Sequence, residues 1–362
     1  MKINHERAKD ILLNAYSVAL SDKDHRCIHS NFLDFILMNK HLTFRYVLFT
    51  AVLAKATNSD INPLCLQAGS TLAGAYDARS LCHKVVVPFE ISELNKAMGG
   101  SNEPFLNKPA RFPELNITNP VKKGNDQLIL NALCENLPKL RNSDDAFNCL
   151  VYLLQKLVEK RNANKKLTEL KVRNKGSNAI FHTFLDSLMD KSFEGEILTL
   201  VVACLYYLHL SDEFTINVNP VNQSGASSKE ISDLDILKSN TLYIGNELKD
   251  KTFTVIDIKH ATDKVITAGG NQMLFIYGKN VEGIPVDILE LKQEYLQVGF
   301  SLRVVPINYF LELMLTLIED VDVEKAIRYM VSIALNTKFK EETVYHLINT
   351  ADVYFEFDLD SC

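Results

Sequence analysis

The chain has few of the features that mark a secreted or zinc-stabilised protein. Its seven cysteines, among 362 residues, form no CxxC pair and follow no regular spacing. An odd number of unpatterned cysteines argues against a disulfide framework and a structural zinc site, and it is typical of a protein in a reducing cytoplasm. Two short fragments, Cys27-Ile28-His29 and Cys82-His83, place a cysteine near a histidine. We expect neither fragment to bind a metal.

Long apolar runs are also missing. The longest apolar stretch covers residues 197–210, whereas a helix needs about 20 apolar residues to cross a bilayer. This stretch therefore predicts a buried core helix. The first residues, MKINHER, are charged and do not resemble a signal peptide. We expect a cytoplasmic protein with no membrane partner.

Sequence motifs of several enzyme classes are absent. The chain has no P-loop, no glycine-rich nucleotide motif of a methyltransferase and no HExxH. Tyr243-Ile244-Gly245 is similar to half of a GIY-YIG nuclease motif, but no Gly-Ile-Tyr strand precedes it. We also find no internal repeat and no low-complexity tract. These absences direct attention to the charged residues.

Charge is divided unevenly along the chain. The formal net charge is -6, yet residues 1–175 contain 25 Lys and Arg against 17 Asp and Glu, and residues 176–362 contain 14 against 28. A basic N-terminal half suits a phosphate backbone, because cationic side chains gain affinity by releasing counterions. An acidic half can still approach DNA if it holds metal cations. The alternative is that this uneven distribution of surface charge has no functional role.

Two domains are expected from the length and the pattern of the chain. Residues 1–170 look mainly helical and basic, although a β-branched run at residues 85–89 predicts a strand. The polar, basic segment at residues 159–175 is the expected boundary. In residues 176–362, helices are expected from residues 196 and 254, at 286–297 and near the C-terminus, and strands at 213–218, 272–277 and 301–307. This order predicts an α/β fold, with a mixed central sheet flanked by helices.

The segment at residues 233–249 carries the most chemical information. It reads DLDILKSNTLYIGNELK and contains Asp235, Glu247 and Lys249. Glu247 and Lys249 are two apart, so on a strand both side chains leave the same face. A turn at residues 238–240 would fold a hairpin that sets Asp235 beside Glu247. Two adjacent carboxylates favour a divalent cation, and oxygen ligands suit Mg²⁺. An acid, a spacer, a second acid and a lysine form the PD-(D/E)xK signature of nucleases, here without the proline.

A competing match, Asp257-Ile258-Lys259, follows closely. Strand propensity does not dismiss it, since the preceding residues are also rich in β-formers. However, Thr254 and Asp257 have the spacing of a helix capping box, and apolar residues then follow at helical spacing. The pattern predicts that Asp257 and Lys259 lie in the first turns of a helix and point in different directions.

Three segments of the chain are similar to a known family. They read ELKDKTFT followed by DIKHA within residues 247–261, YDARSLCHKV at residues 76–85, and NEPFLNKPARF at residues 102–112. Together with the expected strand at residues 272–278, they resemble type II restriction endonucleases of the SacI type. The resemblance implies a PD-(D/E)xK nuclease core that cuts double-stranded DNA.

The resemblance also implies roles for particular residues. Asp235, Glu247 and the carbonyl group of Leu248 would bind Mg²⁺, and Lys249 would orient the attacking water or help to deprotonate it. Asp233 is the alternative first carboxylate, because it shares a strand face with Asp235.

Glu196 corresponds to a helix carboxylate that often lies beside such sites. The equal alternative for Glu196 is a structural residue favoured by the helix dipole.

Sequence readout requires side chains that reach base edges, and the block at residues 102–125 is rich in them. Without the resemblance, the same block reads as a solvated loop. The candidate DNA-binding residues are Lys108, Arg111, Lys122, Lys123 and Asn125.

A homodimer is expected, because one such centre cuts one strand and a two-fold dimer matches a palindromic site. The dimer contact is expected in terminal helices at residues 309–318 and 323–335. A DNA methyltransferase is the expected functional partner. The rival hypotheses are a non-enzymatic DNA-binding or scaffold protein, and a repair or recombination nuclease with the same core.

Overall fold

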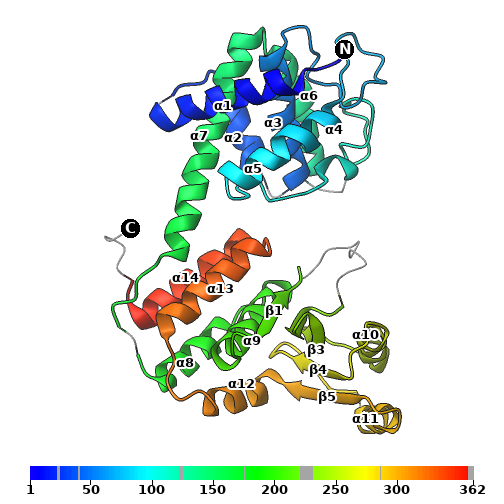
Figure 1. Ribbon diagram of the computed structural model, residues 1–362, viewed down its shortest axis with the longest axis vertical. Coiled ribbons are helices and arrows are strands. Elements are labelled where there is room, and N and C mark those ends of the chain that lie inside the picture. Colours follow the sequence, from blue (N-terminus) through cyan, green and yellow to red (C-terminus); the bar gives the residue numbers. More distant parts are fainter. Residues whose placement is uncertain are drawn as a thin grey trace. The chain divides into compact units, whose positions relative to one another are not determined.

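The computed structural model describes residues 1–22, 25–39, 41–121, 125–174, 176–220, 231–285 and 287–357. The chain divides into two compact units, Met1–Asn164 and Lys165–Cys362. The division falls inside a helix, α7, whose last residues are polar and basic (Figure 1). Among these described residues, no helix is long and apolar enough to cross a membrane.

The first unit is built from helices. Helix α3 is its central element, because nearly all of its side chains are buried. The predicted strand at residues 85–89 is wrong: these residues belong to a π-helical turn, Cys82–Val86, and to α5. Tertiary packing overrides β propensity here, since Val86 and Phe89 are buried in the core of the unit. The main helices are α1 (His5–Ser21), α2 (Ser30–Leu37), α3 (Leu42–Thr57), α4 (Ala78–Leu81), α5 (Val87–Glu93), α6 (Asp126–Asn136) and α7 (Ser143–Thr168).

The second unit has a five-stranded mixed sheet in the order β1-β2-β3-β4-β5. The first three strands are antiparallel, and β3, β4 and β5 are parallel. The predicted mixed α/β sheet is therefore confirmed. The strands are β1 (Phe214–Val218), β2 (Leu234–Lys238), β3 (Thr241–Lys249), β4 (Gln272–Tyr277) and β5 (Ser301–Pro306).

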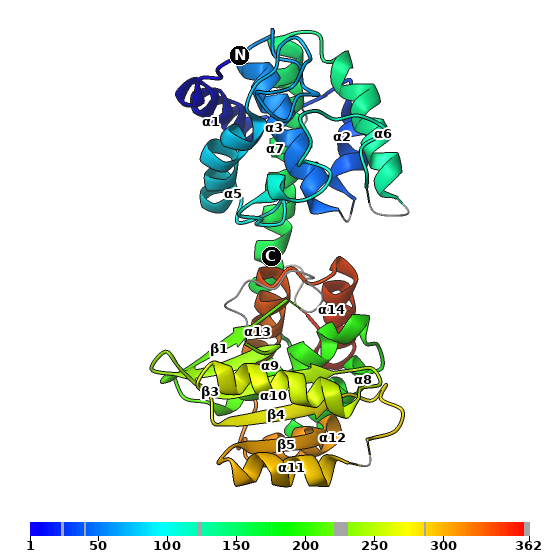
Figure 2. The ribbon, with the colours of Figure 1, turned by 90° about the vertical axis from the view of Figure 1, so that its right-hand side faces the viewer.

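Helices cover both faces of this sheet (Figures 1 and 2). Residues of α10 and α11 pack with Met273 and Phe275 in one core, whereas residues of α9, α12 and α13 pack with Leu248 and Ile276 in the other. Alternate residues of one strand thus enter different cores. The helices are α8 (Asn178–Leu188), α9 (Glu196–His209), α10 (Val255–Thr267), α11 (Ile288–Gln297), α12 (Ile307–Thr316), α13 (Val323–Asn336) and α14 (Glu341–Phe355).

The β2–β3 hairpin fixes the register of the acidic segment. Ser239 and Asn240 form its turn with φ angles of 51° and 62°. Two successive positive φ angles match the tight turn whose twist fits a hairpin. The register pairs Leu234 with Asn246 and Asp235 with Gly245. Continuing it by one residue brings Asp233 to Glu247.

Candidate active site

Strand β3 supplies a carboxylate and an ammonium group at one point. Glu247 and Lys249 leave the same face of the strand, and Lys249 Nζ lies 2.5 Å from Glu247 Oε1. Both side chains are largely buried, at 13% and 24% exposed. An ion pair with so little solvent around it is screened less than a surface pair. The spacing of two residues along the strand therefore brings the carboxylate and the ammonium group into contact, as predicted.

Asp233 completes this group from the residue before β2. Its Oδ2 accepts a hydrogen bond of 2.9 Å from the backbone N–H of Leu248, the residue between Glu247 and Lys249. Burial, together with repulsion from Glu247, raises the pKa of Asp233 to about 6, although Lys249 opposes the shift. Asp233, Glu247 and Lys249 thus form one electrostatic unit, which we call the acidic cluster.

Asp235 has a different environment. Its Oδ1 accepts hydrogen bonds from the hydroxyl and the backbone N–H of Ser232, at 2.5 and 3.2 Å, and its Oδ2 accepts one of 3.2 Å from Asn219. Burial raises its pKa despite these bonds. The expectation that the hairpin sets Asp235 directly beside Glu247 needs correction, because the register places Gly245 opposite Asp235.

Lys249 is held in its charged form. Burial alone would lower the pKa of Lys249, but attraction by Glu247 and Asp233 outweighs burial and leaves the pKa above its usual value. A protonated ammonium group donates hydrogen bonds and offsets negative charge, and it cannot accept a proton. The arrangement favours orientation and charge stabilisation over the alternative role of proton acceptor.

Glu196 is the first residue of α9, as expected, but its carboxylate accepts hydrogen bonds from the start of another helix, α14. It accepts hydrogen bonds from the backbone N–H of Lys340, at 3.0 Å, and from the Thr343 hydroxyl. These groups lie at the start of α14, where backbone N–H groups have no partner within the helix. Burial raises the pKa of Glu196, and both hydrogen bonds oppose the shift. Glu196 therefore caps α14, which agrees with the structural alternative, and its role beside the acidic cluster stays a prediction.

The competing motif is part of the helix that covers the site. Thr254 and Asp257 form the predicted capping box at the start of α10. Lys259 lies 3.6 Å from Glu294, in an exposed ion pair. Asp257 and Lys259 thus interact with different partners, Thr254 and Glu294, as expected from their positions on a helix.

Sequence reasoning missed the residues that hold the base of the hairpin. The Tyr206 hydroxyl donates to Asn246 Oδ1 at 2.8 Å, and Asn246 Nδ2 donates to the Leu234 carbonyl group at 3.0 Å. The backbone N–H of Asn246 donates to the Ser232 hydroxyl at 3.0 Å. Asparagine is uncommon in strands, so its position inside a predicted strand, between Gly245 and Glu247, was the available signal.

The predicted DNA-binding residues belong to the first unit. Lys108, Arg111 and Asn125 are exposed there. The Arg111 guanidinium donates to the Leu106 carbonyl group. Lys122 and Lys123 lie outside the described residues.

Comparison with known families agrees with the division of the chain. Residues 7–161 match the SacI restriction endonuclease N-terminal domain, and residues 175–279 match the SacI restriction endonuclease C-terminal domain. The C-terminal match includes the whole acidic cluster. No curated protein matches the chain. Because the two matches cover most of the chain in the expected order, the chain belongs to the SacI restriction endonuclease family.

Proposed function

We propose that this chain is a Mg²⁺-dependent type II restriction endonuclease that cuts both strands at a short palindromic DNA sequence. Membership of the SacI restriction endonuclease family supports endodeoxyribonuclease activity. The observation that supports Mg²⁺-dependent cleavage is the acidic cluster, in which Asp233, Glu247 and Lys249 meet across one hairpin. Acid, acid and lysine in this arrangement are what a PD-(D/E)xK nuclease requires.

The donor atoms of the cluster fit Mg²⁺. This cation prefers oxygen ligands and is bound through one or two carboxylates. Burial and the neighbouring Glu247 make the Asp233 charge costly, and a divalent cation would remove that cost. We propose Asp233 and Glu247 as its ligands, with the Leu248 carbonyl group as a third. Asp235, the ligand expected from sequence, would instead hold the residues that follow β1 and precede β2, through Asn219 and Ser232.

The residues of the chain would position the water, stabilise charge and hold the metal ligands in place. When bound, Mg²⁺ supplies Lewis-acid polarisation of the scissile phosphate. Lys249, fixed by Glu247, donates hydrogen bonds to the attacking water or to a phosphate oxygen. Its positive charge offsets the negative charge that develops during in-line attack. The hydrogen bond from Leu248 to Asp233 keeps that carboxylate in place.

Incubation of the purified protein with phage DNA and Mg²⁺ tests the proposed function. We expect discrete fragments whose ends map to one short symmetric sequence, and no cleavage when EDTA is present. DNA binding without cleavage under these conditions would favour a non-enzymatic protein. Cleavage without a defined sequence would favour a repair or recombination nuclease.

The pH dependence of cleavage should report the Asp233 carboxylate. Because its pKa is raised to about 6, the carboxylate is ionised above that pH and protonated below it. A protonated carboxyl is a poor cation ligand, so at subsaturating Mg²⁺ the rate should fall about tenfold for each pH unit below about 6. Raising Mg²⁺ should move this limb to lower pH. A rate independent of pH between 5 and 7 at about constant, subsaturating Mg²⁺ would contradict this assignment.

We propose that the exposed basic residues of the first unit contact the DNA backbone. The double variant Lys108→Ala with Arg111→Ala should weaken specific and non-specific binding alike. It should also reduce the slope of log K against log salt by about 1.8, or about 0.9 for each phosphate contact. Lys139→Ala is the matched control, because Lys139 already pairs with Glu135 at 3.0 Å on the surface of the same unit. A changed base preference with an unchanged salt slope would mean that Lys108 and Arg111 read bases.

A homodimer follows from the need to cut two strands with one cluster per chain. Helix α12 and its C-cap offer Tyr309, Leu313 and Leu317, which are 61%, 48% and 56% exposed and four residues apart. Such a spacing forms one apolar face. By contrast, the apolar residues of α13 are buried or partly buried in its own unit. We propose α12 as the contact between two copies.

Light scattering on the DNA complex should give two chains per symmetric site, and one chain per site would exclude the dimer.

A DNA methyltransferase is the proposed functional partner. An enzyme that cuts both strands at a short sequence also threatens the DNA of its own cell, and modification of that sequence would protect it. DNA methylated at the mapped site should therefore resist cleavage.

A further inference from the structure

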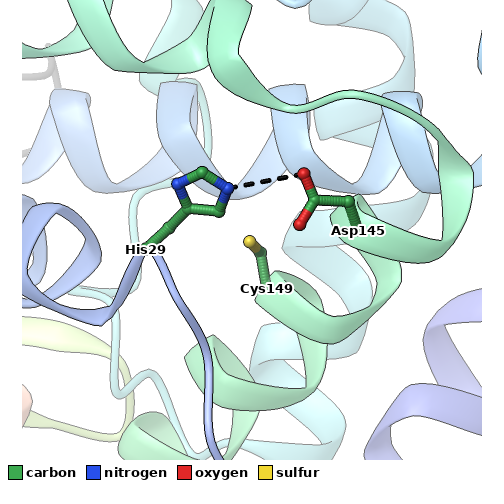
Figure 3. Close-up of side chains that lie close together, drawn as sticks. All are labelled: His29, Asp145 and Cys149. Carbon is green, nitrogen blue, oxygen red and sulfur yellow. Dashed lines mark hydrogen bonds and ion pairs between the residues drawn. The ribbon is translucent and has the colours of Figure 1, made fainter.

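The first unit contains a cluster of metal-ligating side chains that the nuclease chemistry does not use. His29 precedes α2, and Asp145 and Cys149 lie four residues apart in the first turns of α7. One ligand atom from each of the three lies within 4.8 Å of the other two. Figure 3 shows the His29 ring facing the Asp145 carboxylate, with the Cys149 sulfur pointing toward the space between them.

The histidine–aspartate distance of the cluster matches that of a tetrahedral zinc site. His29 Nε2 lies 3.4 Å from Asp145 Oδ2. Zinc bonds of about 2.0–2.3 Å at tetrahedral angles place ligand atoms about 3.3–3.8 Å apart. Cys27 Sγ lies 3.4 Å from Cys149 Sγ, so a second thiol is in contact with one member of the cluster and could supply a fourth donor. Nitrogen, oxygen and two sulfur atoms are all donors that zinc accepts.

The surroundings of the cluster are negative and incompletely paired. Asp34 Oδ2 accepts a hydrogen bond of 2.9 Å from the Tyr152 hydroxyl. Among the described residues, the buried Asp34 Oδ1 has no hydrogen-bond partner. Asp34 and Asp145 both act electrostatically on Cys27. A buried carboxylate oxygen without a partner is costly, and a nearby bound cation would offset the cost at Asp34 Oδ1.

We propose that His29, Asp145 and Cys149, with Cys27 as the fourth ligand, form a structural zinc site. The site ties the segment before α2 to the start of α7, more than a hundred residues later. Such a site departs from the expectation drawn from cysteine spacing, because its ligands come as CxH and DxxxC pairs that only the fold unites. A structural site uses four protein ligands and leaves no open position.

A cysteine-histidine-aspartate catalytic group is the alternative use of the same residue types. A nucleophilic cysteine must reach a substrate, but Cys149 is fully buried. His29 and Asp145 are 14% and 16% exposed, which gives a metal ion access to the cluster but leaves the sulfur behind them. The burial of Cys149 therefore favours metal binding.

Cobalt substitution tests the site in the full chain. The protein is treated with a chelator in the presence of a non-chelating reductant, and Co²⁺ is then added. We expect one equivalent to produce the intense near-ultraviolet absorption of a cobalt-thiolate bond, and stoichiometric Zn²⁺ to displace it. In Cys149→Ser this absorption should be lost or strongly reduced. His29→Ala should bind zinc more than about 100-fold more weakly, since losing even a supporting partner of a ligand costs about 10–100-fold.

Two controls separate this site from the others. Cys134→Ser removes a half-buried thiol of the same unit that lies outside the cluster, and it should bind cobalt like the unmodified protein. Glu247→Ala alters only the acidic cluster and should keep the thiolate absorption. With zinc at about 1,000 times its Kd, the Tm of the first unit should rise by about 10 °C.

Three results would overturn the proposal. The first is the absence of cobalt-thiolate absorption in the folded, reduced protein. The second is unchanged zinc affinity in both His29→Ala and Cys149→Ser. The third is a Cys27–Cys149 disulfide, found by mass spectrometry in protein purified without reductant, that persists when zinc is present during folding.

Discussion

Glu247→Ala is expected to reduce the single-turnover rate of DNA cleavage by at least about 1,000-fold. The substitution removes a proposed Mg²⁺ ligand and frees the Lys249 ammonium, which now lies 2.5 Å from the Glu247 carboxylate. It also removes a charge that raises the pKa of Asp233. The variant should therefore fold at least as well as the parent and bind specific DNA without cutting it.

Cleavage of a supercoiled plasmid under enzyme excess measures this effect, with DNA binding measured separately in the absence of Mg²⁺. Glu282→Ala is the control, because Glu282 is an exposed carboxylate of the same unit outside the acidic cluster. Cleavage by Glu247→Ala at the parental rate would end the PD-(D/E)xK assignment. Loss of both binding and folding would show that Glu247 is structural.

Lys249→Ala should have the second largest effect, a loss of about 100- to 1,000-fold in the same rate. Lys249 is the cation that the structure places within the acidic cluster in direct contact with Glu247, and its raised pKa keeps it charged at neutral pH. Removing it leaves Glu247 and Asp233 without that compensation, so the pKa of Asp233 should rise further. The acidic limb of the pH profile should then move to higher pH.

Lys251→Ala serves as the matched control, because Lys251 is an exposed lysine two residues away. It should cleave at nearly the parental rate. Lys249→Arg should retain part of the activity, since it keeps the charge but changes its shape and reach. If Lys249→Ala cleaved normally while Lys259→Ala did not, the competing motif on α10 would be the correct one.

Local patterns predicted much of the second unit. The strand at residues 272–277 coincides with β4, and the Thr254 capping box begins α10. These elements have strong local signals, namely a short continuous apolar run in β4 and paired side-chain caps at α10. In the first unit, the run at residues 85–89 gave the wrong element, because burial among helices decided its conformation.

Pairings between distant segments could not be predicted in the same way. The sequence offered both Asp233 and Asp235, which share a strand face, and only the hairpin register distinguishes them. Glu196 likewise opens its helix as predicted, but its hydrogen-bond partners are more than 140 residues away. The His29, Asp145 and Cys149 cluster depends on contacts of the same kind.

Asp233, with Glu247, is proposed to form the metal-dependent centre that cuts DNA. Single-turnover cleavage by Asp233→Asn and Asp235→Asn, compared side by side, tests it most directly. Both substitutions preserve size and remove one charge. We predict that Asp233→Asn is slowed by more than about 100-fold, whereas Asp235→Asn stays within about tenfold of the parent and loses about 1–3 kcal/mol of stability as its hydrogen bonds to Ser232 and Asn219 weaken. An inactive Asp235→Asn beside an active Asp233→Asn would show that Asp235, and not Asp233, belongs to the metal-dependent centre.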